Sequence, residues 1–506
     1  MGLLSSQILH HRESDTIDLQ LEAQSSPSNL SGSRKCKQSS GPYLGSRSGS
    51  HGSVNKGENL QHILSTSYGE KMIPSKYAYQ TLFLNGETSD IKIRALGKVW
   101  CLHKLFLCQS GYFANVFRDS WEESHKDIIE LEINGQNIDV GSLHFVLGSL
   151  YRDEDVLMEP LQIPGVLATA CLLEVENLIQ KCDETMKETI NTKTVYSYYA
   201  AAETYGLDTV KTQCFEWLLH NLMTQLSVTL YKELSIDLMN LLISSSDLLV
   251  MQKEMDVYTR LKEWMFLRLN PTWKGSLNQL LVNANNWFSK HREHGSNTAF
   301  LETKEGITFQ PVFKKLRFQH IISDLASIRV IEQDTLIPSE WLSSVYKQQW
   351  FTLLKAQQCG EIGPRDINKT ELESYSLRCG KRILKDGKYS WKWSGYNFGF
   401  PLHVIFTSHY ITFFPSHYII FKQNIYSQLC EDSACLQSLR NIAFRLTLVY
   451  FDSSGKLSFS KTTDYKIFTF VKDEEQVVMK LDGIALSFPL YIFCNFLFVS
   501  LENTVN

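Results

Sequence analysis

The chain has 506 residues, of which 43% are hydrophobic and 12% aromatic. At about 150 residues per domain this length predicts roughly three folded units, and the apolar content excludes a chain that is disordered throughout. The 50 basic and 54 acidic residues give a net charge of −4, without a long run of either sign. This balance disfavours a dominant nucleic-acid-binding surface, so we expect no direct nucleic-acid partner.

The cysteines and the apolar stretches indicate an intracellular protein. Eleven cysteines are scattered along the chain without a CxxC pair, which is typical of reduced thiols and not of a disulfide framework. The most apolar stretch, 488–501, spans only 14 residues. It is too short to cross a bilayer, and we interpret it as a buried strand. We expect no signal peptide at the N-terminus.

Residues 1–74 are rich in Ser, Gly, Gln, Asn and His and lack periodic apolar positions, which predicts a disordered tail. The first six residues, MGLLSS, fit the pattern M-G-x-x-x-[ST] and predict N-myristoylation of Gly2. This pattern is short, and an unmodified N-terminus is the alternative. A single acyl chain would give only weak, reversible membrane contact.

The ordered part opens with short strands at 90–93 and 98–102, followed by apolar positions at helical spacing from Leu105 to Phe117. Ser110 is the predicted N-cap of the second helix in this stretch. Residues 128–133 predict a further strand. This alternation of strands and helices indicates a mixed module.

Residues 160–355 show the spacing of amphipathic helices, whereas alternation with period two begins beyond Arg378. Lys381–Lys385 and Lys388–Trp393 flank Asp386-Gly387, which predicts a β-hairpin. Ile442 to Tyr450 alternates in the same way. The C-terminal part is therefore expected to form an antiparallel sandwich or barrel.

No catalytic motif stands out. The sequence lacks G-x-S-x-G, a Walker A loop, G-x-G-x-x-G and H-E-x-x-H. His291 and His294 have no third candidate ligand nearby, which favours a solvent-exposed helix end over a metal site. Cys108 lies in an apolar helical pattern and is interpreted as a packed thiol, not a nucleophile. We therefore expect no enzyme activity, no metal and no cofactor.

The segment from Ser89 to Phe117 resembles the first half of a BTB/POZ domain. Its run H-K-x-x-L-x-x-S-x-Y-F-x-x-V-F, which begins at His103, is similar to the most diagnostic stretch of that family. The similarity continues through 129–131, 145–151 and 167–182. The resemblance implies a homodimer formed through this domain.

The helical residues that follow resemble a BACK domain, for example at Ala201-Ala202-x-x-Tyr205-x-Leu207 and Leu316-Arg317-Phe318. Proteins of this type often continue into a kelch propeller, but six blades of about 50 residues each do not fit into the 146 residues after Gly360. This departure makes the chain resemble the germ cell-less proteins, which combine a myristoylation-type N-terminus, BTB and BACK-like regions and a β-rich C-terminus.

The expected fold class is α+β multidomain: a BTB/POZ α/β module, an α-helical BACK-like array and a C-terminal antiparallel β domain, either sandwich or barrel. The boundaries that follow are a tail at 1–74, the BTB/POZ domain at 75–188, the BACK-like domain at 189–358, a linker at 359–376 and the β-rich domain at 377–506.

The resemblance implies a substrate adaptor of a cullin-3 ubiquitin ligase with a role in germ-cell development and spermatogenesis. Cullin-binding relatives carry a hydrophobic-x-Glu motif after the second helix, and Trp121-Glu122-Glu123 stands in that place here. The implied cullin contacts are Phe117, Trp121, Glu122, Glu123 and Tyr151. The alternative is an exposed loop that happens to contain tryptophan.

The C-terminal β domain is the implied reader of the protein substrate. Twelve aromatic residues lie between Tyr389 and Phe421, and most of them must belong to a core. Trp391 and Trp393 share one face of a strand, and this face is either core or a substrate-binding surface.

The resembled family also implies a location in the nucleus, at the nuclear envelope or matrix, and possible further presence in the cytoplasm. A non-catalytic nuclear-envelope scaffold or transcriptional corepressor is the alternative function. An enzyme active site in the β domain is a further alternative, but no residue pattern in the sequence supports it.

Overall fold

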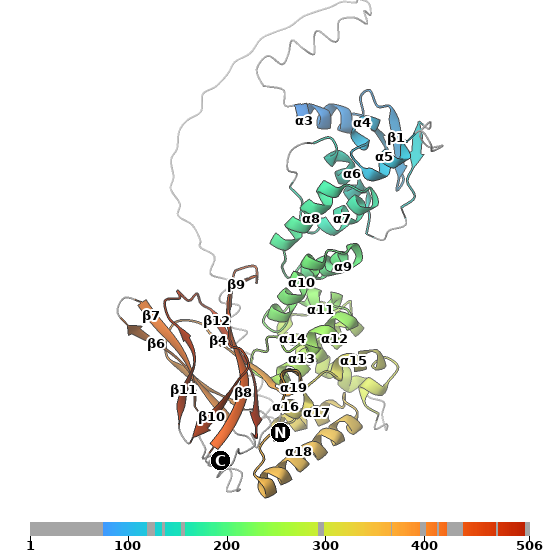
Figure 1. Cartoon of the computed structure of the whole chain (residues 1–506). Coiled ribbons are helices and arrows are strands. Elements are labelled where there is room, and N and C mark those ends of the chain that lie inside the picture. The colour runs from blue at the N-terminus through green and yellow to red at the C-terminus, as the bar shows by residue number, and fades with distance from the viewer. Residues whose placement is uncertain are drawn as a thin grey trace, which may run out of the picture. The chain divides into compact units, whose positions relative to one another are not determined.

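The structure is a computed structural model that describes residues 74–118, 127–133, 137–152, 157–291, 298–365, 367–394, 401–411, 414–422, 439–471 and 474–500. The chain divides into two compact units (Figure 1). Unit 1 comprises residues up to 134 and 139–157, and unit 2 comprises 135–138 and 158–506. The tail predicted at 1–74 lies, but for Pro74, outside the described residues, and Gly2 with it.

Unit 1 is built around a three-stranded sheet in which β1 is the central strand. β1 pairs antiparallel with β2 and parallel with β3. Alternate β1 side chains are buried, as expected for a strand with one face on a core. The elements of the unit are α3 (Pro74–Tyr77), the π-helical turn η1 (Ala78–Leu84), β1 (Ile91–Ala95), β2 (Lys98–Leu102), α4 (Lys104–Leu107), α5 (Gly111–Val116), β3 (Ile128–Glu130) and α6 (Val140–Ser149). The predicted strands are confirmed, although β3 is shorter than predicted.

The first part of unit 2 is helical, as predicted. Gly206 and Gly360 follow α9 and α18 with φ of 74° and 73°, the left-handed conformation in which glycine commonly ends a helix. The elements are α7 (Ile163–Leu172), α8 (Glu176–Glu188), α9 (Val195–Tyr205), α10 (Asp208–Asn221), α11 (Val228–Glu233), α12 (Ile236–Ser244), α13 (Glu254–Leu269), α14 (Leu277–Lys290), η3 (Phe300–Glu302), η4 (Ile307–Phe309), α15 (Gln310–Phe313), α16 (Phe318–Ile321), α17 (Leu325–Asp334), α18 (Ser339–Cys359) and α19 (Lys369–Tyr375). None of the described helices is both long and apolar enough to span a membrane.

The C-terminal part of unit 2 consists of two antiparallel sheets. One has the order β10-β8-β12-β4, with β9 also paired to β8, and the other has the order β11-β7-β6-β5. Its strands are β4 (Leu377–Ile383), β5 (Tyr389–Ser394), β6 (Pro401–Ile411), β7 (Phe414–Lys422), β8 (Leu439–Phe451), β9 (Leu457–Thr462), β10 (Lys466–Val471), β11 (Glu475–Leu481) and β12 (Leu490–Val499). The apolar stretch at 488–501 thus supplies the buried inner strand β12, as predicted.

The hairpin predicted at Asp386-Gly387 is wrong. β4 pairs with β12 in the first sheet, whereas β5 pairs with β6 in the second. The Asp-Gly turn therefore carries the chain from one sheet to the other. A turn dipeptide reports only the local change of direction, while the partner of each strand is set by the apolar faces that it buries.

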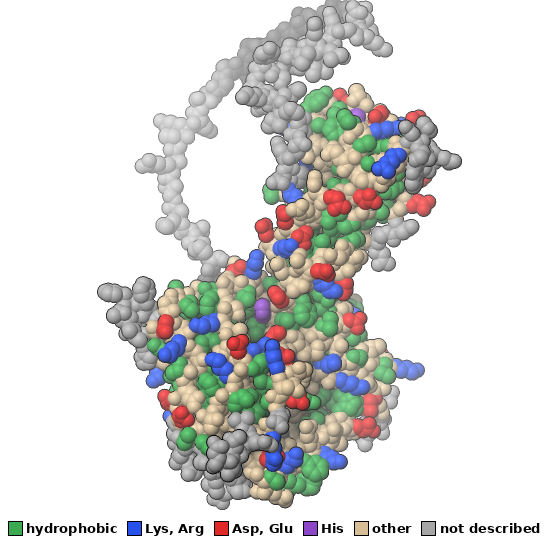
Figure 2. Space-filling view, viewed as in Figure 1, with side chains coloured by type: hydrophobic (Ala, Val, Ile, Leu, Met, Phe, Trp, Pro, Cys, Tyr) green, Lys and Arg blue, Asp and Glu red, His purple; other side chains and the backbone are tan. Residues whose placement is uncertain are grey.

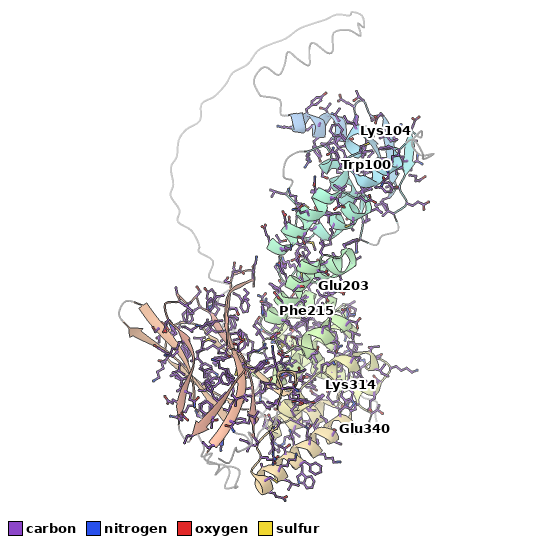
Figure 3. The ribbon with its side chains drawn as sticks, in the orientation of Figure 1. Trp100, Lys104, Glu203, Phe215, Lys314 and Glu340 are labelled. Atoms are coloured by element: carbon purple, nitrogen blue, oxygen red, sulfur yellow. The ribbon has the colours of Figure 1, made fainter. Side chains whose placement is uncertain are left out.

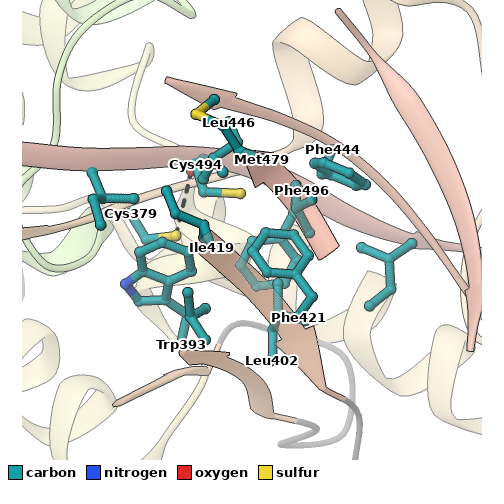
Figure 4. Close-up of a cluster of buried hydrophobic side chains, with 14 of the residues drawn as sticks. Cys379, Trp393, Leu402, Ile419, Phe421, Phe444, Leu446, Met479, Cys494 and Phe496 are labelled. Carbon is teal, nitrogen blue, oxygen red and sulfur yellow. Dashed lines mark hydrogen bonds between the residues drawn. The ribbon is translucent and has the colours of Figure 1, made fainter. Parts of the chain in front are cut away.

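The core of the C-terminal part lies between the two sheets. Figure 4 shows Trp393, Leu402, Phe421 and Phe444 gathered there, and all four side chains are buried. The centroids of the Phe421 and Phe444 rings, from opposite sheets, are 5.0 Å apart. The described strands therefore form a sandwich and not a closed barrel, which decides between the two expected architectures.

Candidate functional site

Phe117 lies at the C-terminal end of α5 in unit 1. The side chain of Ser110 caps this helix by accepting a hydrogen bond from the Phe113 backbone N–H at 3.3 Å, which confirms the predicted N-cap. The half-buried Phe117 ring stacks on Phe113 with 5.9 Å between centroids. Figure 3 labels Lys104 in unit 1. Its Nζ lies 5.6 Å from the centroid of the Phe117 ring. Part of the ring stays exposed beside a cation, and it is available to a partner.

Trp121, Glu122 and Glu123, the residues of the predicted cullin motif, lie outside the described residues. They follow Phe117 by four to six positions in the sequence. Their assignment therefore remains a prediction from the sequence.

Tyr151 is buried in unit 1, with 2% of its surface exposed. Its ring stacks on Phe106 at 4.2 Å between centroids, and its hydroxyl accepts the His103 backbone N–H at 2.8 Å. His103 Nε2 donates to the Glu87 carbonyl at 2.9 Å, and Nδ1 of the same ring lies 3.2 Å from the Tyr151 hydroxyl. Burial raises the pKa of Tyr151 well above its usual range. This correction to the expected contact role places Tyr151 in the core, where it positions α4 from beneath.

Leu105 is an exposed residue of unit 1 that the sequence reasoning did not single out. It is 80% exposed on α4, whereas Leu107 on the same short helix is fully buried. The signal was present in the Leu-Phe-Leu triplet at 105–107, because a helical turn cannot direct three consecutive apolar side chains into one core. Leu105 and Phe117 give the α4–α5 region exposed apolar area of the kind that protein interfaces use.

Trp393 belongs to the sandwich core, whereas Trp391 packs against the edge of that core. Trp393 is 5% exposed, and its Nε1 donates to the Gly380 carbonyl of the opposite sheet at 3.3 Å. The half-buried Trp391 packs against the same core, with 5.6 Å between the two indole centroids. Trp393 is therefore a packing residue, while the substrate contact at Trp391 stays a prediction from the sequence.

A buried ion pair joins the sheets of unit 2 to its helices. Arg378 of β4 donates from Nε to Glu254 Oε1 at 2.8 Å and from Nη2 to Oε2 at 3.0 Å. Its Nη1 donates to the carbonyls of Ile243 and Ser245, at the end of α12, at 2.9 and 2.8 Å. Both charged side chains are at most 1% exposed. Sequence reasoning missed this pair because its members are 124 positions apart and neither belongs to a local motif.

Arg317 and His320 surround the same carboxylate. Arg317 Nε lies 3.9 Å from Glu254 Oε1, and its Nη1 donates to the Ser376 carbonyl. Burial, followed by the charge of Arg378, lowers the pKa of Arg317 to about 9. Burial acts to raise the pKa of Glu254, but the charge and hydrogen bonds of Arg378 outweigh it and lower that pKa. Glu254 is thus held ionised between two cations, and we name Glu254, Arg317, His320 and Arg378 the junction cluster.

Acid is expected to destabilise the junction cluster. Burial lowers the pKa of His320 to about 4 from 6.5, so its contribution is complete above pH 6.5 and is lost as pH falls toward 4. The lowered pKa of Glu254 acts in the same direction below the ordinary glutamate range. Thermal unfolding measured in steps from pH 7 to pH 4 should therefore show a steadily falling midpoint. A midpoint that stays constant over this range would contradict the prediction.

The sequence of this chain is similar to two known domain families and to several known proteins. The BTB/POZ domain family matches residues 79–190, and the family described as BTB And C-terminal Kelch matches residues 195–281. Germ cell-less protein-like 2 of Mus musculus is 56% identical over 507 residues, covering the whole of both chains. The chain belongs to the germ cell-less family.

Two further relatives extend this similarity. Germ cell-less protein-like 1 of Homo sapiens is 59% identical over 88% of this chain and 85% of its own length. Protein germ cell-less of Drosophila melanogaster is 33% identical over 85% of this chain and 78% of its own length. The germ cell-less similarity thus reaches well past the BACK match, over the later helices and the sandwich that replace a kelch propeller here.

Proposed function

We propose that this germ cell-less family member is a non-catalytic substrate adaptor of a cullin-3 ubiquitin ligase that acts in germ-cell development. The BTB/POZ match followed directly by the BACK match carries the proposal. In this assignment the α4–α5 region of unit 1 and the motif at Trp121 to Glu123 bind cullin-3, while unit 2 recruits a protein substrate. Self-association through the BTB/POZ domain would give the adaptor two substrate sites and hence avidity.

The exposed residues of unit 1 support an interface of this kind. Phe117 presents a half-buried aromatic ring beside Lys104, and Leu105 adds exposed apolar area. Interface hot spots are enriched in aromatic residues surrounded by polar groups. Trp121, followed by two glutamates, would complete such a set.

The test is co-precipitation of cullin-3 with the full chain and with a Trp121→Ala/Glu123→Ala variant. Loss of two hot-spot side chains should weaken cullin-3 binding by at least about tenfold. The matched control is Trp350→Ala/Glu340→Ala, which removes the same residue types from exposed positions on α18 and should bind cullin-3 normally. If the intact chain does not bind cullin-3, the nuclear scaffold or corepressor function replaces the adaptor.

Because of the junction cluster, deletion of the sheets is unsuitable for mapping the substrate-binding surface. Deletion of 377–506 would remove Arg378 and leave Glu254 buried with only Arg317 nearby as a cation. An unpaired buried charge is strongly destabilising, so a truncation would damage the helices as well as remove the sheets. Point variants on the surface of unit 2 separate recruitment from folding.

A further inference from the structure

A pocket with a volume of about 690 Å³ opens in unit 2 between α16, α18, α19 and the end of β12. Gln348, Thr352 and Lys355 of α18 line one side, and His320 of α16 and Tyr375 of α19 line another. This volume is in the range of pockets that hold specific ligands.

His320, which lines this pocket, holds a buried acceptor without a described donor. Its Nε2 donates to the Tyr375 carbonyl at 2.6 Å, so the neutral ring carries its lone pair on Nδ1. Nδ1 has no hydrogen-bond partner among the described residues, although His320 is only 3% exposed. A buried acceptor without a donor costs free energy. Nδ1 has less than 1 Å² of accessible surface, so a ligand in the pocket would contact the exposed side chains of α18 and not this atom.

The pocket continues along α18 into a second hollow of about 400 Å³, which Ser344, Lys347, Gln348, Phe351, Thr352 and Lys355 line. These residues recur every three or four positions and therefore share one face of the helix. Gln348, Thr352 and Lys355 line both hollows. We name this continuous surface the α18 groove. Phe351, 47% exposed, gives it an apolar contact.

The charges of the α18 groove favour an anionic ligand. Three basic side chains line it, those of Lys347, Lys355 and Arg365, against the two carboxylates of Glu361 and Glu371, and Glu361 pairs with Arg365. Lys347 and Lys355 are exposed, and neither has a carboxylate partner among the described residues. Figure 2 shows acidic and basic side chains interspersed over the visible surface. Lys347 Nζ lies 5.9 Å from the centroid of the exposed Phe351 ring, so a charged and an apolar contact are next to each other on this face of α18.

We propose that the α18 groove binds a short acidic peptide segment of the substrate protein, with its carboxylates on Lys347 and Lys355. The amide side chains of Gln319 and Gln348, which also line the groove, match peptide N–H and C=O groups. The inference rests on the proposed adaptor function and names the chemistry of its substrate site.

The experiment selects binders of the immobilised full chain from a phage library of short random peptides. The enriched peptides should be rich in Asp and Glu. Synthesised with a fluorescent label, they should bind a Lys347→Glu/Lys355→Glu variant at least about tenfold more weakly in a polarisation assay, because each lost charge-assisted hydrogen bond contributes this much. A Lys347→Gln/Lys355→Gln variant should show a smaller loss.

The matched control is Lys304→Glu/Lys315→Glu, which reverses two exposed lysines of the same helical region that do not line the groove and should leave peptide affinity unchanged. Thermal unfolding of each variant verifies that the fold is retained. Enrichment of neutral or basic peptides, no enrichment, or equal affinity for the wild-type chain and both groove variants would overturn the proposal.

Co-precipitation of cullin-3 with the Lys347→Glu/Lys355→Glu variant tests the adaptor function separately from peptide binding by the α18 groove. Binding of cullin-3 should be unchanged, because the groove lies in unit 2. Acidic-peptide binding without any cullin-3 binding by the intact chain would remove the adaptor function and leave the groove as a peptide site. Cullin-3 binding without acidic-peptide binding would remove the groove alone.

Discussion

The Arg378→Ala variant should lose about 3–5 kcal/mol of unfolding free energy, the usual cost of removing one partner from a buried ion pair. Arg378 donates four hydrogen bonds from its guanidinium, two to Glu254 and two to backbone carbonyls of Ile243 and Ser245. Alanine leaves all of these acceptors buried without that donor. Because domains are stable by only about 5–15 kcal/mol, this loss is a large part of the total.

Denaturant unfolding of the full chain, followed by circular dichroism, measures the effect. The matched control is Lys381→Ala, which truncates an exposed residue of the same strand and should stay within about 0.5 kcal/mol of the wild-type chain. Limited proteolysis should also cut Arg378→Ala faster between the helices and the sheets. Equal unfolding curves for the two variants would show that the junction cluster does not hold these parts together.

The backbones of the sandwich and of the helical part of unit 2 also approach each other closely. A Cβ atom at Gly380 of β4 would lie 2.3 Å from the Val250 carbonyl oxygen, so only glycine fits where the strand runs against the helical region. Asn495 of β12 adds a hydrogen bond from its side-chain amide to the Ser246 carbonyl at 2.8 Å. The sandwich is thus attached through the edge strand β4 and its neighbour β12, and a peptide bound at the α18 groove would be carried by helices and sheets together.

Local patterns in the sequence predicted the elements well. Ser110 predicted the start of α5 correctly, because a capping hydroxyl needs only the backbone N–H of the residue three positions later. The alternation from Ile442 to Tyr450 gave β8, and the apolar stretch at 488–501 gave β12. Each of these signals is complete within a few residues, so no knowledge of the tertiary structure was needed.

Non-local pairings were beyond the same reasoning. Asp386-Gly387 marked a turn correctly, but nothing near it indicated that β4 and β5 would enter different sheets. The ion pair of Arg378 and Glu254 likewise depends on two segments meeting in space. No sequence motif includes His320, and its place in the wall of a pocket follows from the tertiary structure alone.

The Trp393→Ala variant should lose about 3–5 kcal/mol of unfolding free energy, as large-to-small changes in cores do. Trp393 lies between the two sheets at 5% exposure, and its Nε1–H bonds across them to Gly380. Alanine would open a cavity and leave that carbonyl without its donor. Trp391→Ala should cost less, since Trp391 is only half-buried at the edge of the same core.

Denaturant unfolding of both variants, beside substrate recruitment measured in cells, separates packing from recognition. If Trp393 is a core residue, its alanine variant loses unfolding free energy, and substrate recruitment falls only in proportion to the fraction of folded protein. If Trp393 instead contacts the substrate, its alanine variant loses recruitment at unchanged stability. That result would assign Trp391 and Trp393 to a substrate-binding surface. The burial of Trp393 between the sheets leaves little of its ring for a partner to touch, whereas Lys347 and Lys355 on α18 are exposed to a peptide.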